Sequence, residues 1–228
     1  MTAVTSVKRE SAAGGPRGEE TRVRLLEAAL KIFGELGFEG ASTRALAEAA
    51  GANLAAIPYH FGSKEGLYRA AAEFIIERTG KEIFPTLSKI EAAVASRRLS
   101  REDAIALLHE LLERFGAIVI GSEFADSFAA FVMREQLQPG AAFEILYQGM
   151  MRRMIESCTR LLAIAGDRRS DDSRTMIKAQ TLLGQVLVFR TSRACVLRQL
   201  GWRAISKEQL KLIQSIIAEN VDRILALR

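Results

Sequence analysis

Residues 42–68 read STRALAEAAGANLAAIPYHFGSKEGLY, two short amphipathic segments joined at a glycine. In the first segment, small and apolar residues recur at the spacing of one helical face: Thr43, Leu46, Ala47 and Ala50. Ser42 or Thr43 can cap this helix, and Gly51 is placed to end it in the left-handed conformation. Asn53 can cap a second helix of about two turns over residues 54–60. This order predicts a helix-turn-helix unit, whose second helix enters the major groove of DNA.

The residues of this stretch carry a resemblance to a known family. Over residues 21–68 the chain resembles the DNA-binding domain of the TetR family of bacterial transcriptional regulators. The matching elements keep fixed offsets: Thr43-Arg44, Ala50-Gly51, Tyr59-His60-Phe61 and the SKEGLY of residues 63–68. The wording NLAAIPYHFGSKEGLY further resembles a subgroup with a distinctive C-terminal domain, some of whose members are linked to efflux and antibiotic sensitivity.

That resemblance implies an all-α regulator that binds double-stranded operator DNA as a homodimer. It further implies a repressor that an unknown small-molecule effector releases from a palindromic operator, with efflux or drug-response genes as targets. An alternative stays open, in which the C-terminal domain only dimerises or binds a protein and no small molecule acts. Calorimetry with candidate small molecules separates the two, because a pure dimerisation domain binds none.

The resemblance also assigns DNA contacts to individual side chains. It places Thr43, Tyr59, His60 and Lys64 on phosphates, and Arg44 on a phosphate or a base edge. Lys64 fits this role physically, since it is a cation at the start of the helix that follows the reading helix. Phosphate contacts position a protein on DNA without reading its sequence.

The outward face of the second helix is predicted to read the bases. It consists of Asn53, Leu54, Ala55 and Ala56, of which only Asn53 can form side-chain hydrogen bonds. Contact with thymine methyl groups is therefore the natural mode of recognition, and Asn53 either pairs with adenine or caps the helix. Pro58 stands where the family commonly has an aromatic or hydrogen-bonding residue, and it predicts a kink or an early end to the helix.

The rest of the chain divides into three expected parts. Residues 1–20 are rich in glycine and predict a flexible tail, in which Lys8, Arg9 and Arg17 could reach a minor groove. Residues 21–67 form the DNA-binding domain, beginning with a helix over residues 21–36 that ends at Gly37. Residues 68–228 form a helical ligand-binding and dimerisation domain, joined to the head by a helix that starts at Ser63.

No strand pattern follows, so the fold class is all-α: a three-helix head on a larger helical domain. Helix starts and stops predict further helices near residues 83–97, 100–120, 123–138, 141–165, 172–200 and 206–227. The helix 172–200 is apolar on several faces around residues 182–189 and therefore needs cover on several faces. We place it in the dimer interface, with 141–165 as the favoured partner helix and 206–227 as the second choice.

Aromatic residues lie on one helix face, and side chains with polar ends follow among apolar residues. This combination predicts a small-molecule pocket. The candidate lining residues are Phe124, Phe128, Phe131, Arg134, Tyr147, Gln148, Gln185 and Arg190. The alternative, without a ligand site, is that the aromatic residues belong to the hydrophobic core and the arginines form ion pairs with glutamates such as Glu135, Glu144 and Glu156. The sequence itself shows no ligand.

Composition excludes several function classes. The net charge is +5, but residues 1–64 carry only one more basic than acidic residue, so charge does not locate the DNA site. Only two histidines are present, with no metal-ligand spacing or catalytic motif, so we expect no enzyme, no metal site and no cofactor. Cys158 and Cys195 are predicted to be buried thiols. With no signal-like or membrane-spanning segment, we expect a cytoplasmic protein without a membrane partner.

Overall fold

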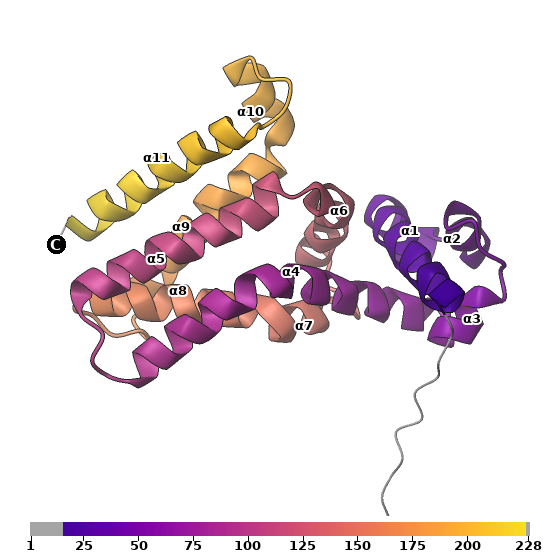
Figure 1. Cartoon of the computed structure of the whole chain (residues 1–228), viewed down its shortest axis with the longest axis horizontal. Coiled ribbons are helices and arrows are strands. Elements are labelled where there is room, and N and C mark those ends of the chain that lie inside the picture. The colour runs from indigo at the N-terminus through magenta and orange to yellow at the C-terminus, as the bar shows by residue number, and fades with distance from the viewer. Residues whose placement is uncertain (1–15, 227–228) are drawn as a thin grey trace, which may run out of the picture.

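The computed structural model describes residues 16–226, and every regular element among them is helical, as the sequence predicted (Figure 1). The elements are α1 Pro16–Gly40, α2 Thr43–Ala49, α3 Ala56–Phe61, α4 Lys64–Ala95, α5 Arg101–Gly116, η1 Ala117–Gly121, α6 Glu123–Leu137, α7 Phe143–Leu146, η2 Tyr147–Met151, α8 Arg152–Ala165, α9 Ser173–Thr191, α10 Arg193–Leu200 and α11 Lys207–Ala226. The two η elements are π-helical turns. Helices α1–α3 form a head at one end of an elongated molecule, and α4 runs from this head into the larger bundle.

Helix α1 begins earlier than predicted, at Pro16 instead of Thr21. Proline suits the first helical position, because the amide it lacks would have no partner there. Arg17 therefore belongs to the first turn of α1, whereas Lys8 and Arg9 lie outside the described residues. At the other end, Gly37 has a φ of 75°, which breaks the helical path at the predicted residue.

Helix α4 corrects two predictions, because it merges the helix expected from Ser63 with the one expected over residues 83–97. Pro85 lies inside it and is exposed to solvent. A proline in a helix removes one backbone hydrogen bond, and a carbonyl left without its partner on the solvent side can bind water instead. Ser63 caps the helix by accepting a hydrogen bond from the amide of Gly66 at 3.0 Å.

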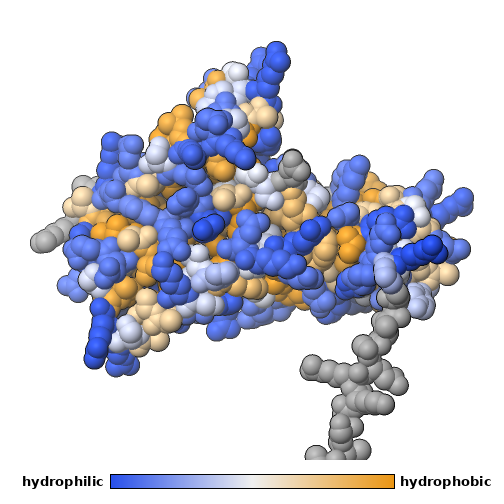
Figure 2. Space-filling model, in the orientation of Figure 1, coloured by the Kyte–Doolittle hydropathy of each residue, from blue (hydrophilic) through white to orange (hydrophobic). Residues whose placement is uncertain are grey.

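The C-terminal bundle also departs from the prediction at residues 172–200. Instead of one helix, α9 ends at Thr191 and α10 begins at Arg193, with non-helical angles at Ser192 (φ −109°, ψ 26°). The α10 segment projects from the bundle, and Figure 2 shows hydrophilic and hydrophobic surface mixed over this face of the molecule. Cys195 lies on α10 and is exposed, so the prediction of a buried thiol holds for Cys158 alone.

The buried apolar residues form one continuous cluster from the head to α11. Within the head it includes Leu46 of α2 and Ile57 of α3, and in the bundle it includes Val221 of α11. Among the described residues no single helix is long and apolar enough to cross a membrane. One pair, Arg101–Gly121 with Phe124–Leu137, meets the length and composition test only when joined across a 98° bend.

Candidate nucleic-acid interface

Helices α2 and α3 adopt the predicted helix-turn-helix arrangement. The Ser42 hydroxyl accepts a hydrogen bond from the amide of Ala45 at 3.1 Å and so caps α2. Gly51 follows with a φ of 57°, which an L-residue with a side chain rarely adopts. Leu46 and Ile57 anchor the two helices in the core of the head, because both are almost fully buried.

Helix α3 starts two residues later than predicted, at Ala56 instead of Leu54. A turn precedes it, in which the side-chain oxygen of Asn53 accepts a hydrogen bond from the amide of Ala55 at 2.9 Å. Asn53 therefore caps the turn that leads into α3. Of its two predicted roles, capping and pairing with adenine, this corresponds to capping. Pro58 is the third residue of α3, where a missing amide donor costs little because first-turn amides have no helical acceptor.

The outward side of α3 exposes side chains that the core of the head does not use. Tyr59 is 76% exposed and Leu54 is 53% exposed. Ala55 and Pro58 are also exposed, whereas Ala56 is partly buried against the core. Leu54, Ala55 and Pro58 border an open hollow of about 570 Å³, together with Thr43, Asn53 and Lys64. Of the face predicted to read the bases, Asn53, Leu54 and Ala55 are exposed, whereas Ala56 is partly buried.

Two further candidates lie on the same head. Thr43 and Arg44 are exposed in the first turn of α2. Within the described part of the chain, the Arg44 guanidinium makes no hydrogen bond or ion pair. His60 is partly buried, and its ring lies edge-on to the ring of Tyr59 with centroids 4.8 Å apart.

Lys64 has a structural role that the sequence did not reveal. Its ammonium group donates hydrogen bonds to the carbonyl oxygens of Phe38 at 2.9 Å and Ala41 at 3.1 Å. It also lies 4.2 Å from the centroid of the Phe38 ring, within cation–π range. Lys64 thus ties the start of α4 to the connection between α1 and α2, and one of its three N–H groups remains for a phosphate.

Gly66 permits the close approach of α3 and α4. A Cβ atom at this position would lie 1.9 Å from the carbonyl oxygen of Phe61, a distance that no real contact tolerates. The glycine in the SKEGLY segment is therefore required by packing. This contact fixes the end of the reading helix against the first turn of α4.

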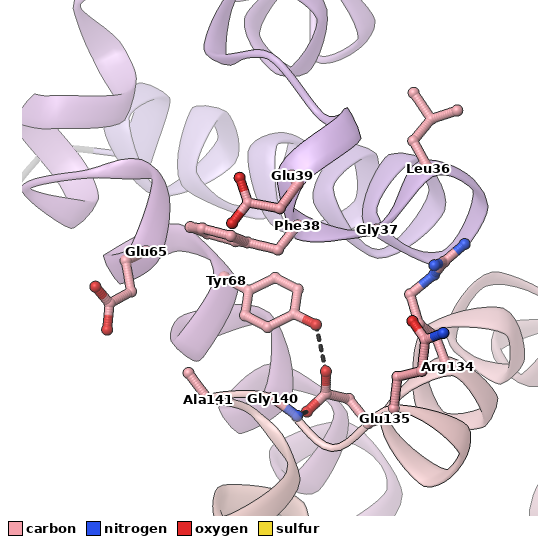
Figure 3. A pocket seen from close by; sticks show the side chains of 11 residues that line it. Leu36, Gly37, Phe38, Glu39, Glu65, Tyr68, Arg134, Glu135, Gly140 and Ala141 are labelled. Carbon is pink, nitrogen blue, oxygen red and sulfur yellow. Dashed lines mark hydrogen bonds between the residues drawn. The ribbon is translucent and has the colours of Figure 1, made fainter.

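A buried polar cluster joins the start of α4 to the end of α6 (Figure 3). The Tyr68 hydroxyl on α4 donates a hydrogen bond to Glu135 at the end of α6. The other carboxylate oxygen of Glu135 accepts from the amide of Gly140 at 3.1 Å. Burial raises the pKa of the Tyr68 phenol above its ordinary value, and the hydrogen bond to the Glu135 carboxylate raises it further.

The neighbouring residue, Arg134, joins α6 to α1. Its guanidinium donates to the carbonyl oxygens of Gly34 at 3.3 Å and Glu35 at 3.0 Å. Between these helices Gly34 allows close packing, since a Cβ atom there would lie 2.9 Å from the Cβ of Ala130 and the backbone nitrogen of Phe131. The orientation of the head is therefore set by contacts with α6.

The residues predicted to line a ligand pocket lie at several separate places in the bundle. Phe131 packs on Tyr68, Phe124 packs between Phe74 and Phe128, and Arg134 contacts α1. Further away, Tyr147 stacks on Phe143 and Gln148 bonds to Glu144. Gln185 accepts a hydrogen bond from Asn220 at 3.0 Å, and Arg190 pairs with Asp126. Of the predicted set, Arg134 borders two hollows of the described structure, both beside α1 and α6.

Among the described residues no three His, Cys, Asp or Glu side chains lie close enough together to hold a metal ion. The Nε2 atom of His109 on α5 lies 3.0 Å from a carboxylate oxygen of Asp222 on α11. Cys158 is buried, and burial raises the pKa of its thiol to about 12. A thiol with such a pKa stays protonated at neutral pH and is a poor nucleophile.

Comparison with known proteins agrees with this geometry. Residues 25–71 match the family described as "Bacterial regulatory proteins, tetR family", and residues 104–227 match the "HTH-type transcriptional dual regulator CecR, C-terminal domain". The chain is 34% identical to the HTH-type transcriptional dual regulator CecR of Shigella flexneri, over 92% of this chain and 93% of that protein. It is 52% identical to the HTH-type transcriptional regulatory protein RaaS of Mycobacterium tuberculosis, over 24% of this chain and 25% of that protein.

Solved structures share the fold at low sequence identity. AibR, crystallised with isovaleryl coenzyme A and operator DNA, gives a TM-score of 0.62 at 14% identity, over 87% of this chain and 96% of that chain. HlyIIR, a hemolysin II transcriptional regulator, gives 0.51 at 18% identity, over 92% and 97%. These relatives are regulators, not enzymes. The chain belongs to the TetR family of bacterial DNA-binding transcriptional regulators, with a C-terminal domain of the CecR type.

Proposed function

We propose that this regulator is a ligand-released repressor that binds a palindromic operator as a homodimer in the cytoplasm. The observation that carries the DNA-binding part is the outward face of α3 and of the turn before it, where Leu54, Ala55 and Tyr59 are exposed and make no part of the core of the head. Residues 21–67 act as the reading unit, and residues 68–228 supply dimerisation and ligand control.

Contacts on the DNA fall into two groups. Thr43, Tyr59, His60 and the remaining N–H of Lys64 contact phosphates and fix the position of the head. Leu54 and Ala55 approach base edges and favour thymine through its methyl group, while Arg44 reaches a phosphate or a guanine. The amide nitrogen of Asn53 stays available for a base, since only its oxygen bonds to Ala55.

Apolar surface on α9 and α11 supports dimerisation. Large apolar side chains are exposed along both helices: Met176, Ile177, Leu187, Val188, Leu212 and Ile216. The two helices lie against each other, and the side chains of Gln185 and Asn220 hydrogen-bond between them. A run of exposed apolar side chains on paired helices marks a protein interface. We therefore assign α9 and α11 to the dimer, which makes 206–227 the favoured partner helix and replaces our first choice of 141–165.

Ligand release draws support from a relative and from the resemblance to the subgroup. AibR was crystallised with both a small molecule and operator DNA, and its fold is similar. The Shigella relative is called a dual regulator, so activation at some promoters is an outcome that the test must allow. We propose efflux or drug-response genes as targets.

The test is binding to the DNA that flanks this chain's own gene, measured by fluorescence anisotropy, followed by selection from random duplexes. A palindromic consensus with two half-sites supports the proposal. Tyr59→Phe should weaken binding on every sequence, and Tyr147→Phe is the matched control, because Tyr147 lies far from the head in η2. Binding to random DNA with no consensus would refute sequence-specific recognition. If calorimetry finds no small molecule that binds, the alternative of a purely dimerising C-terminal domain stands.

A further inference from the structure

Two hollows lie at the junction of head and bundle, on either side of the Arg134 side chain. The first has a volume of about 370 Å³ and is lined by the end of α1, the start of α4 and the end of α6 (Figure 3). The second has a volume of about 330 Å³ and lies between α1 and α6. Arg134 and Gln138 border both, so a single ligand can extend from one hollow into the other.

The first hollow combines aromatic walls with negative charge. Phe38 and Tyr68 line it, together with the carboxylates of Glu39, Glu65 and Glu135. Arg134 supplies one positive charge and donates to backbone carbonyls of α1, but three carboxylates face this one guanidinium, so the lining stays net negative. Glu65 is paired with Arg69 at the exposed rim, a surface contact that water screens. The hollow therefore favours a cation.

Glu135 is the strongest part of this argument, because it is only 1% exposed. Both carboxylate oxygens accept hydrogen bonds, one from the Tyr68 hydroxyl and one from the Gly140 amide. No Lys, Arg or His of residues 16–226 lies within ion-pair distance of it. A buried carboxylate is normally balanced by a positive charge, since desolvation of an unpaired charge is costly.

The second hollow is apolar. Gly34, Ala130 and Met133 line it, and Leu137 at its edge is 75% exposed. Leu36, from the lining of the first hollow, is also exposed. Large apolar side chains gathered at a groove mark a binding surface for apolar groups.

We propose that this junction binds a lipophilic organic ammonium ion. The cationic head lies in the first hollow among Glu39, Glu65 and Glu135 and against the aromatic rings, which attract cations through their π faces. The hydrocarbon tail lies in the second hollow beside Met133 and Leu137. This inference rests on the proposed ligand control and gives it a site and a ligand class, at a place that none of the predicted pocket residues except Arg134 reaches.

Binding here would act directly on the head. The cation lies between α1, α4 and α6, the helices whose contacts hold the head in place. Attraction of Glu135 toward a ligand competes with its hydrogen bond to Tyr68, which ties α4 to α6. The ligand thereby favours a different head orientation, and DNA binding must weaken the ligand by the same factor.

The experiment is isothermal titration calorimetry of the full chain without DNA, with hexyltrimethylammonium as the probe. Hexanol and hexyl sulfate are the matched neutral and anionic probes, all below micelle-forming concentrations. We expect the cation to bind at least about tenfold more tightly than hexanol, and the sulfate not to bind. The three probes share the same hexyl chain and differ in the charge of the head group, which the carboxylates of the hollow attract or repel.

Variants locate the site. The double change Glu39→Gln and Glu65→Gln removes exposed rim charges without touching the core, and should weaken the cation about three- to tenfold. Glu135→Gln should weaken it at least about tenfold, and Leu137→Ser should weaken all probes that bind. Glu73→Gln is the matched control, an exposed glutamate on α4 outside the lining, and should change nothing.

Three outcomes would overturn the proposal: no binding of the cation, hexanol binding as tightly as the cation, or undiminished cation affinity in both the rim variant and Glu135→Gln. Operator release is measured separately by anisotropy with the same probe. If the cation binds as expected but DNA stays bound, the site stands and ligand release by this site fails. If DNA is released by another compound and the cation does not bind, the proposed function stands and the site fails.

Discussion

Replacing Gly66 with alanine tests the packing that fixes the reading helix. The new Cβ would lie 1.9 Å from the carbonyl oxygen of Phe61, whereas ordinary contact begins near 3.4 Å. This oxygen belongs to the backbone, so no side chain can rotate away, and α3 must move relative to α4. Alanine also gains about 1 kcal/mol of helix propensity over glycine, which offsets part of the cost.

The expected size follows from these opposing terms. Overpacking typically costs about 1–3 kcal/mol, so after the gain in helix propensity the net loss of unfolding free energy should be about 0–2 kcal/mol. The larger effect falls on DNA binding. Helix α3 has six residues, and Ile57 is its one residue with a nearly fully buried side chain, so displacing α3 is the cheapest way to relieve the clash. We expect at least about a tenfold loss of operator affinity, which corresponds to about 1.4 kcal/mol.

Urea denaturation and fluorescence anisotropy measure the two effects on the same samples. Gly116→Ala is the control, since a Cβ atom there meets its nearest neighbour at an ordinary 3.7 Å, and α5 should gain up to about 1 kcal/mol. If Gly66→Ala leaves both the unfolding midpoint and the DNA affinity unchanged, the close contact between α3 and α4 does not exist in solution.

Other predictions test the DNA face, the dimer and one ion pair. Ala55→Gln should change the selected consensus, because glutamine pairs with adenine and crowds a thymine methyl; an identical consensus from random-DNA selection would remove this face as the reader. Ile177→Glu together with Val188→Glu should yield monomers in analytical ultracentrifugation, and a persisting dimer would exclude the α9 face. The Arg153 guanidinium bonds to Glu91 and holds the pKa of that carboxyl below its ordinary 4.5. Arg153→Gln should therefore reduce stability above about pH 4.5, and its difference from wild type in urea titrations should vanish as the pH falls through the lowered pKa.

The sequence could predict those features that depend on neighbouring residues. Ser42 and Ser63 cap helices through amides three residues away, and Gly51 ends α2 by a positive φ. Such signals lie within one turn of the chain and need no knowledge of the fold. The helix-turn-helix unit and the all-α class followed from them, together with the apolar periodicity of each helix.

Features that depend on distant contacts could not be predicted this way. Lys64 looked like a free cation, but two carbonyl groups more than twenty residues earlier hold its ammonium group. The aromatic face of α6 looked like a pocket lining, yet Phe131 packs against Tyr68 of α4. The break at Ser192 has no proline or glycine to signal it in the sequence.

The first turns of α4 bring the DNA face and the junction together within five residues. Lys64 holds the connection between α1 and α2, Gly66 contacts the end of α3, and Tyr68 bonds to Glu135 of α6. A displacement of the end of α6 therefore reaches α3 through residues 64–68 of α4. This segment is little more than one helical turn, too short to absorb the displacement by bending. Coupling between the junction and the DNA then needs no long pathway through the bundle, only two alternative positions of α4 against α6. Ligands that act elsewhere in the bundle must move this same contact to release DNA, so Tyr68→Phe should reduce their effect on operator binding while leaving their affinity for the DNA-free protein little changed.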